Sequence, residues 1–438
     1  MGKLAKGLLG ISVLLATSTG FAAEDLLTVY RDAVVSDPTL KRAAALRLAD
    51  REAVPQARSL SLPRIDGRAG KTYIHNFDGN EQIDGTFNTQ NITISAVQPI
   101  FNMGNRVLRE QAELVAEQAD AELETVDQGL ISRVINAYLD VLQEQADVTF
   151  VLADKEATAR QLEQAQRRFE VGLITITDVE EAQAALDQVN ADEVVQRNDV
   201  AAALEALREI TGESYRDLYG LSARVPLAPP EPSAPEVWVQ AALSNNPGVI
   251  ASTLGADIAR KDVEFEKADR LPTLDLQAAV SHNRNNRSDP KSINDASVGV
   301  VLNVPLYQGG AIASRIREAA FRFEAAKENL EGDQREVVRR VQDAYRNVLA
   351  AISLIEAQDQ ARTSARSSLE ATEAGYEVGT RTIVDVLDAQ RVLFNAERNY
   401  QIGRIAYIRN LVALEAAAGT LSEEEVVLIN GWLEPSSA

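Results

Sequence analysis

The sequence contains no cysteine, which excludes disulfides, thiolate metal sites, cysteine nucleophiles and a lipidated N-terminal cysteine. It has only two histidines, which leaves little material for histidine-based metal or acid–base chemistry. Basic residues are also few: 44 Lys and Arg face 65 Asp and Glu, and the net charge of −21 argues against a nucleic-acid-binding protein. Aromatic residues make up only 5% of the 438 residues, which is little for a large aromatic-packed core. The abundant Ala, Gln, Glu and Arg favour long helices instead.

The N-terminal residues 1–23 have the pattern of a secretory signal peptide. Lys3 and Lys6 form a basic start, residues 8–16 are a short apolar run, and residues 20–23 offer a small-residue cleavage site. A short buried helix is the alternative interpretation. No later segment has the run of about 18 apolar residues that a transmembrane helix needs, so this exported chain could enter a membrane only through β-strands.

The chain is a tandem repeat, because its two halves align at an offset of about 207 residues. The matching landmarks, given as first and second copy, are Asp37-Pro38 and Asn246-Pro247, Leu62-Pro63 and Leu271-Pro272, Tyr138 and Tyr345, Gly172 and Gly379, and Asp178 and Asp385. The segments that we predict are a first repeat over residues 24–220, a proline-rich linker over 221–236, a second repeat over 237–420 and a C-terminal segment over 421–438.

Within each repeat the pattern predicts a helix, two strands, a long helix, a turn and another helix. The first helices are expected at about 26–60, with Asp37 and Pro38 as N-cap and first-turn proline and with a kink or end at Pro55, and at about 237–270. Alternating apolar residues predict strands at about 64–77, 87–100, 272–283 and 295–305. The long helices cover about 102–169 and 309–376, each a rod of roughly 100 Å at 1.5 Å per residue, and end in turns at about 169–178 and 376–385.

Four strands are too few to close a transmembrane barrel, which starts at about eight. If the strands enter a membrane, the chain must therefore associate, and two, three or four copies would give eight, twelve or sixteen strands. Leu274, Leu276, Val298 and Val300 would then face lipid, whereas Asp275, Gln277 and Asn303 would face the lumen. A soluble sandwich that uses the apolar faces as its core is the alternative.

The repeat plan and four segments resemble the TolC family of outer-membrane efflux and type I secretion channels. The segments are 171–179 (VGLITITDV), 374–389 (AGYEVGTRTIVDVLDA), 271–276 (LPTLDL) and 305–310 (PLYQGG). The resemblance extends over nearly the whole chain. It implies a mainly α fold with a small β part: a homotrimer whose twelve helices form a tunnel that a twelve-stranded antiparallel β-barrel continues.

The same resemblance implies an exit duct in the outer membrane of a Gram-negative bacterium that extends into the periplasm. Such a duct serves tripartite multidrug efflux, type I protein secretion or both, as a passive channel with no enzyme activity and no cofactor. A periplasmic adaptor and an inner-membrane pump of the RND, ABC or MFS type would open it, and lipid would surround the strands. A periplasmic coiled-coil scaffold or adhesin stalk without channel activity is the competing interpretation, and a constitutively open porin is a third.

The two helix turns are the expected functional sites. Gly172 and Gly379 fit helix C-termini with left-handed backbone, and Thr177 with Glu180 makes a possible capping box for the next helix. Capping alone is therefore one interpretation of Asp178 and its counterpart in the second repeat.

The repeat offers a further comparison, because Phe169, Ile174 and Glu181 in the first copy correspond to Tyr376, Arg381 and Asp388 in the second. Arg381 can donate a fork of hydrogen bonds, and Asp178 of a neighbouring helix pair is the expected acceptor. A solvated ion pair of little energetic weight is the alternative. The roles that the resemblance implies are a periplasmic gate of Thr177, Asp178, Tyr376 and Arg381, an acidic constriction ring of Asp385 and Asp388, and adaptor contacts at Gly172 and Gly379.

Overall fold

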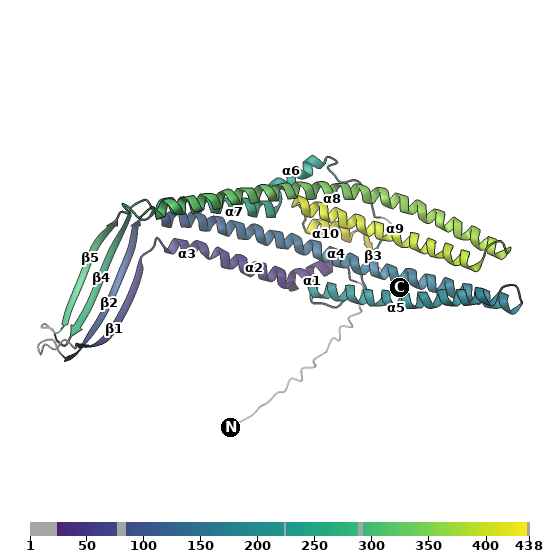
Figure 1. The fold of residues 1–438 in the computed structure, drawn as a ribbon, viewed down its shortest axis with the longest axis horizontal. Coiled ribbons are helices and arrows are strands. Elements are labelled where there is room, and N and C mark those ends of the chain that lie inside the picture. Colours follow the sequence, from purple (N-terminus) through teal and green to yellow (C-terminus); the bar gives the residue numbers. More distant parts are fainter. Residues whose placement is uncertain (1–23, 77–84, 223–224, 288–291, 436–438) are drawn as a thin grey trace, which may run out of the picture.

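The computed structural model describes residues 24–76, 85–222, 225–287 and 292–435, so the predicted signal peptide lies outside the described residues. A long helical body carries a four-stranded sheet at one end and two helical hairpin tips at the other (Figure 1). The protein is thus mainly helical with a small β part, as predicted. No helix in the described ranges has a stretch that is long and apolar enough to cross a bilayer.

The first predicted helix, at 26–60, is in fact three helices: α1 (Leu26–Ser36), α2 (Pro38–Arg51) and α3 (Ala53–Ser59). Asp37 has ψ 119°, so the chain leaves the helix there, and its carboxylate accepts a 2.7 Å hydrogen bond from Leu40 N as the N-cap of α2. The second break, at Glu52, lies three residues before Pro55, because a proline ring clashes with the carbonyl four residues earlier. The second repeat divides once, at Asn246, into α6 (Pro235–Asn245) and α7 (Pro247–Ala268).

Four helices form two long hairpins. They are α4 (Met103–Glu170) with α5 (Ile176–Thr211), and α8 (Ala311–Glu377) with α9 (Ile383–Ala418). The 68 residues of α4 extend about 100 Å, which confirms the predicted rods. The turns are shorter than predicted and cover residues 171–175 and 378–382.

The sheet is antiparallel, in the order β1 (Arg64–Asn76), β2 (Gly85–Phe101), β4 (Thr273–Asn285), β5 (Ser292–Asn303). The two hairpins of the repeat join through β2 and β4, where Ile94 lies opposite Val280. Leu276 of the predicted lipid-facing set lies opposite Val300, and Ala278 lies opposite Val298. The period-two alternation therefore places the apolar side chains of neighbouring strands on one face, as the sequence predicts.

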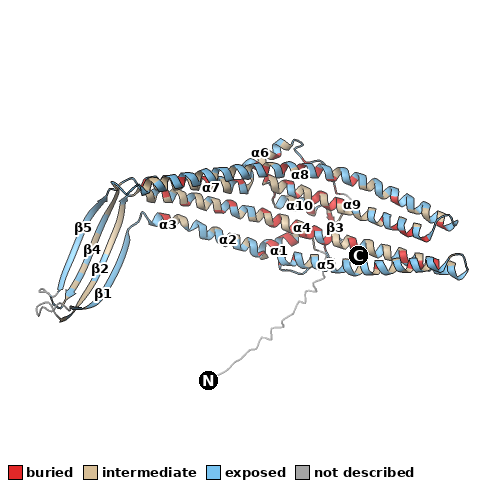
Figure 2. Cartoon of the chain, viewed as in Figure 1, coloured by how far each residue is buried: buried red, intermediate tan, exposed pale blue. Residues whose placement is uncertain are grey.

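The main apolar core lies in the middle of the helical body, where Figure 2 shows the buried residues concentrated. Here α10 (Glu423–Asn430) and the two-stranded sheet of β3 (Gly220–Leu221) and β6 (Leu433–Glu434) close the end of each repeat. The C-terminal segment contributes Leu421, Val426 and Ile429 to this core. Both the linker and the C-terminal segment thus fasten the two repeats together.

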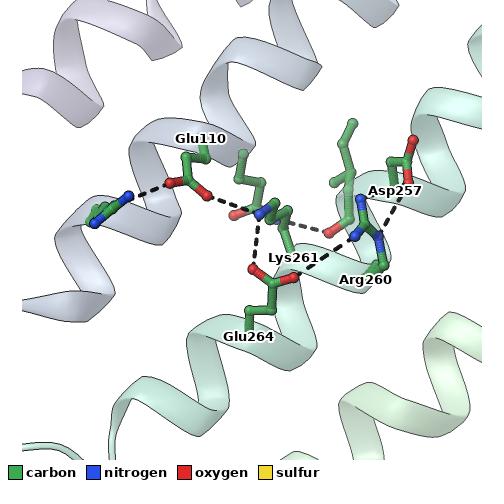
Figure 3. A network of polar contacts seen from close by, with 8 residues as sticks. Glu110, Asp257, Arg260, Lys261 and Glu264 are labelled. Atoms are coloured by element: carbon green, nitrogen blue, oxygen red, sulfur yellow. Dashed lines mark hydrogen bonds and ion pairs between the residues drawn. The ribbon is translucent and has the colours of Figure 1, made fainter.

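A polar network holds the repeats together nearer the sheet, between α4 and α7 (Figure 3). The Lys261 ammonium lies 2.8 Å from carboxylate oxygens of Glu110 and of Glu264. These hydrogen bonds raise the pKa of Lys261, so its charge persists throughout the physiological range. Ion pairs therefore join the two repeats near the sheet, and apolar packing joins them in the middle of the helical body.

Candidate functional site

Each hairpin tip begins with a left-handed glycine. Gly172 has φ +75° and donates a 2.9 Å hydrogen bond to Phe169 O, and Gly379 has φ +79° and donates a 3.1 Å bond to Tyr376 O. This geometry ends α4 and α8 and confirms the predicted role of both glycines at helix C-termini. A Cβ atom added at either glycine would meet nothing within 4 Å among the described residues of this chain, and the adaptor contacts at the two glycines stay a prediction.

Capping boxes start the helices that return from the tips. The Asp178 carboxylate accepts hydrogen bonds of 2.8 Å from the amide and from the hydroxyl of Thr175. In the second tip, Asp385 accepts a 2.8 Å bond from the Thr382 amide and donates its own amide to the Thr382 hydroxyl at 3.2 Å. The predicted capping box of Thr177 with Glu180 is wrong.

Thr177 lies one residue inside α5, which begins at Ile176, and its side chain is exposed. Its role in the gate stays a prediction. The local capping role of the two aspartates is confirmed, and it leaves further lone pairs on each carboxylate for other donors.

Arg381 lies exposed at the end of the second tip. The amide and hydroxyl of Thr382, together with the charge of Arg381, hold the pKa of Asp385 below its usual range. Among the described residues of this single chain, no hydrogen bond or ion pair joins Arg381 to Asp178. The contact predicted with a neighbouring helix pair stays a prediction.

The two predicted ring residues lie on α9, three residues apart and hence on one face of the helix. The side chain of Asp388 is exposed and lies 3.4 Å from Arg391, whereas Asp385 is half-buried. Both carboxylates therefore lie close to the tip, and the acidic constriction ring stays a prediction.

Tyr376 is buried at the C-terminus of α8, against Ile383, Val386 and Leu387 of α9. The guanidinium of Arg168, which belongs to the other hairpin, stacks on the Tyr376 ring at 4.4 Å from the ring centre. Sequence reasoning missed Arg168. A signal was available, because its counterpart in the second repeat, at an offset of 207, is Gly375.

Polar contacts also link α4 to α9 between the tip and the central core. Arg398 forms two 2.7 Å hydrogen bonds to the Asp147 carboxylate, of which only 3% is exposed. Gln390 donates to Asp154 at 2.8 Å and to Thr158 at 3.1 Å. The two hairpins of one chain therefore meet through charged and amide groups, and these groups were not predicted.

Comparison with known proteins gives a family match in both halves of the chain. The model of the family described as outer membrane efflux protein matches residues 29–213 and 238–420. The outer membrane protein TolC of Vibrio cholerae serotype O1 is 40% identical over 430 residues, covering 97% of each chain. The TolC protein of Escherichia coli K12 is 36% identical, covering 99% of this chain and 90% of the relative.

More distant relatives and solved structures also match this chain over most of its length. The alkaline protease secretion protein AprF of Pseudomonas aeruginosa is 28% identical, covering 98% of this chain and 91% of the relative. Among solved structures, VceC of Vibrio cholerae superposes with a TM-score of 0.78 at 20% identity, covering 90% of this chain and 96% of the other. CusC superposes with the same TM-score at 17% identity, covering 91% and 93%. These two likenesses concern the fold.

Proposed function

Because this chain belongs to the outer membrane efflux protein family, we propose that three copies form a passive exit channel that crosses the outer membrane and extends through the periplasm. The family relationship supports this function over the scaffold or adhesin stalk. The channel would conduct substrates whose transport an inner-membrane pump drives, and a periplasmic adaptor would connect the pump to the channel. Its relatives include one named an efflux protein and one named a protease secretion protein, so efflux and protein secretion are both candidate roles.

The open sheet is the observation that carries this proposal. In the described parts of the chain, β1 and β5 each have a partner strand on one side only. The strands have 12 to 17 residues, more than the roughly 9–11 that a tilted strand needs to cross a bilayer. Their apolar face is exposed, with Val298 at 77% and Ile65 at 72%.

A lone sheet with two open edges and an exposed apolar face is unstable in water and in lipid alike. Three copies joined edge to edge would pair every edge and give twelve strands, an even number within the known range of such barrels. The apolar face would then lie in lipid and the polar face would line the lumen. Four strands per chain account for the need to associate, and the family supplies the number three.

The hairpin tips would close the opposite end of the channel. Asp178, Tyr376 and Arg381, with Thr177 beside them, would form the gate, and Asp385 and Asp388 would line its narrowest point. A ring of carboxylates favours cations over anions. The Arg381 guanidinium has no carboxylate within salt-bridge distance among the described residues, which leaves its donors available for a neighbouring copy.

The test is single-channel conductance of the purified protein in a planar bilayer, for the wild type and for Arg381→Ser. Arg167→Ser is the matched control, because it also removes a tip arginine, but one that is paired, within the part of the chain that the structure describes, with Glu163 on its own helix. We expect a small wild-type conductance that rises in Arg381→Ser and stays small in the control. Folded, membrane-extracted protein that forms no channels would refute the channel, and a channel unaffected by Arg381→Ser would refute the gate alone.

A further inference from the structure

The two hairpins of one chain have separate apolar cores near their tips. Leu162, Ala165 and Ala182 form the core of the first hairpin. Tyr376 and its neighbours on α9 form the core of the second, and among the apolar side chains that the structure describes in the first hairpin, Ala185 alone packs against it. Pulling the hairpins apart at the tip would therefore expose little apolar surface, so apolar packing alone holds them together weakly.

Arg168 spans this gap. It lies half-buried on α4, two residues from the end of the helix, and its guanidinium stacks on the Tyr376 ring at 4.4 Å. The same guanidinium donates to Tyr376 O at 3.4 Å and to Glu377 O at 3.4 Å. One side chain of the first hairpin thus contacts both the last ring and the last carbonyls of α8.

These carbonyls favour a cation. The last turn of a helix leaves carbonyl groups without intrahelical partners, and the helix dipole makes this end negative. A planar guanidinium suits both features, because it can stack on a ring and donate to two carbonyls at once. A lysine at the same position would keep the positive charge but lose the planar set of N–H donors that reaches two carbonyls at once.

The repeat comparison gives an independent reason for this arrangement. Where the first hairpin has Arg168, the second has Gly375, and a Cβ atom at Gly375 would lie only 2.8 Å from Cγ of Arg381. The missing side chain lets the stem of Arg381 fold back over the end of α8. Arg168 at the first tip therefore reaches across to the other hairpin, whereas Arg381 at the second tip is exposed.

We propose that Arg168 is a positioning residue of the gate: it holds the two hairpins of one chain together at the closed tip by binding the C-terminal end of α8. This role rests on the proposed channel and is separate from that of Arg381, because Arg168 acts within one chain. It fixes Tyr376, and with it the turn that carries Arg381, against the first hairpin. When an adaptor or pump opens the tip, this contact must break.

The experiment compares Arg168→Ala, Arg168→Lys and Arg167→Ala with the wild type in planar bilayers. The neighbouring Arg167 is the matched control, because it is exposed and its ion-pair partner among the described residues is Glu163, four residues before it on the same helix. We expect Arg168→Ala to raise the fraction of time in the high-conductance state roughly tenfold, the effect of a modest change in a two-state equilibrium. Arg168→Lys should lie between it and the wild type, and Arg167→Ala should match the wild type.

Heat dissociation of the oligomer on a gel accompanies each recording. An open fraction that rises in Arg168→Ala while the dissociation temperature stays near that of the control supports the positioning role. Equal open fractions in Arg168→Ala and Arg167→Ala overturn it, and so does a lower dissociation temperature with an unchanged open fraction, which is a purely structural effect. Failure of the channel itself is distinguishable, because it appears as absent conductance in the wild type.

Discussion

Two equivalent glycines, one in each repeat, should respond very differently to alanine. Gly212 and Gly419 follow α5 and α9, and both are left-handed, with φ +75° and +73°. At Gly212 an added Cβ would lie 3.6 Å from the side chain of Ser36, which is an ordinary contact. At Gly419 it would lie 2.5 Å from Cα and 2.7 Å from N of Asn246, which is an overlap with backbone.

Asn246 has little freedom to move away. Its side chain accepts hydrogen bonds from Gly248 N at 3.0 Å and Val249 N at 3.3 Å as the N-cap of α7, and it donates to Ala417 O at 3.1 Å. Left-handed backbone costs an alanine about 1 kcal/mol, and backbone displacement by overpacking adds about 1–3 kcal/mol. Gly212→Ala should thus cost about 1 kcal/mol of the free energy of unfolding, and Gly419→Ala about 2–4 kcal/mol.

The assay is thermal unfolding in detergent followed by tryptophan fluorescence. The sequence has two tryptophans, and both Trp238 and Trp432 pack in the central core that also contains Ala418, next to Gly419. An unfolding entropy of about 2.1 cal/mol/K per residue makes 1 kcal/mol equal to about 1 °C for a chain of this length. We expect the midpoint to fall by about 1 °C in Gly212→Ala and about 2–4 °C in Gly419→Ala. Equal shifts, or a larger shift in Gly212→Ala, would refute the packing argument.

Three further predictions concern the tip and the hairpin contacts. Gly379→Arg adds a side chain where the chain itself has open space, so it should block adaptor crosslinking and efflux while oligomers still form. Asp147→Ala leaves Arg398 without its ion-pair partner and should lower the free energy of unfolding by about 2–3 kcal/mol. This is less than for a fully buried pair, because the Arg398 side chain is 43% exposed. An oligomer dissociation temperature equal to that of the wild type would contradict this prediction. The pKa of Asp385 is lowered in the folded chain. The stability that this helix cap contributes is therefore complete above the ordinary pKa of 3.8 and is lost as the pH falls through the lower folded pKa. The Asp385 carboxylate should stay charged at about pH 5, so cation selectivity, measured by reversal potential, should persist at that pH.

Much of the fold follows from local chemistry in the sequence. Asp37-Pro38 and Asn246-Pro247 interrupt helices because each pairs an N-cap side chain with a proline that starts the next helix. The strands follow from period-two alternation, and their bounds agree with the structure within a few residues. The left-handed turns at Gly172 and Gly379 follow equally directly, because only glycine adopts this backbone without strain.

The capping box shows where local reasoning becomes ambiguous. Residues 175–180 contain two threonines, each followed three residues later by an acid, so Thr175 with Asp178 and Thr177 with Glu180 fit equally well. The structure selects the earlier pair because α5 begins at Ile176, close behind the turn at Gly172. A helix start that varies by two residues cannot be read from the pattern alone.

The sequence by itself determined the repeat, the order of the elements and the residues with unusual backbone, because each depends on neighbours in the chain. Only the tertiary structure decided which side chains meet between the hairpins. Arg168 and Tyr376 are 208 residues apart, and Asp147 and Arg398 are 251 apart. Helical periodicity shows which residues share a face, but the rotation and offset of one hairpin against the other arise from packing in the central core, which no local pattern specifies.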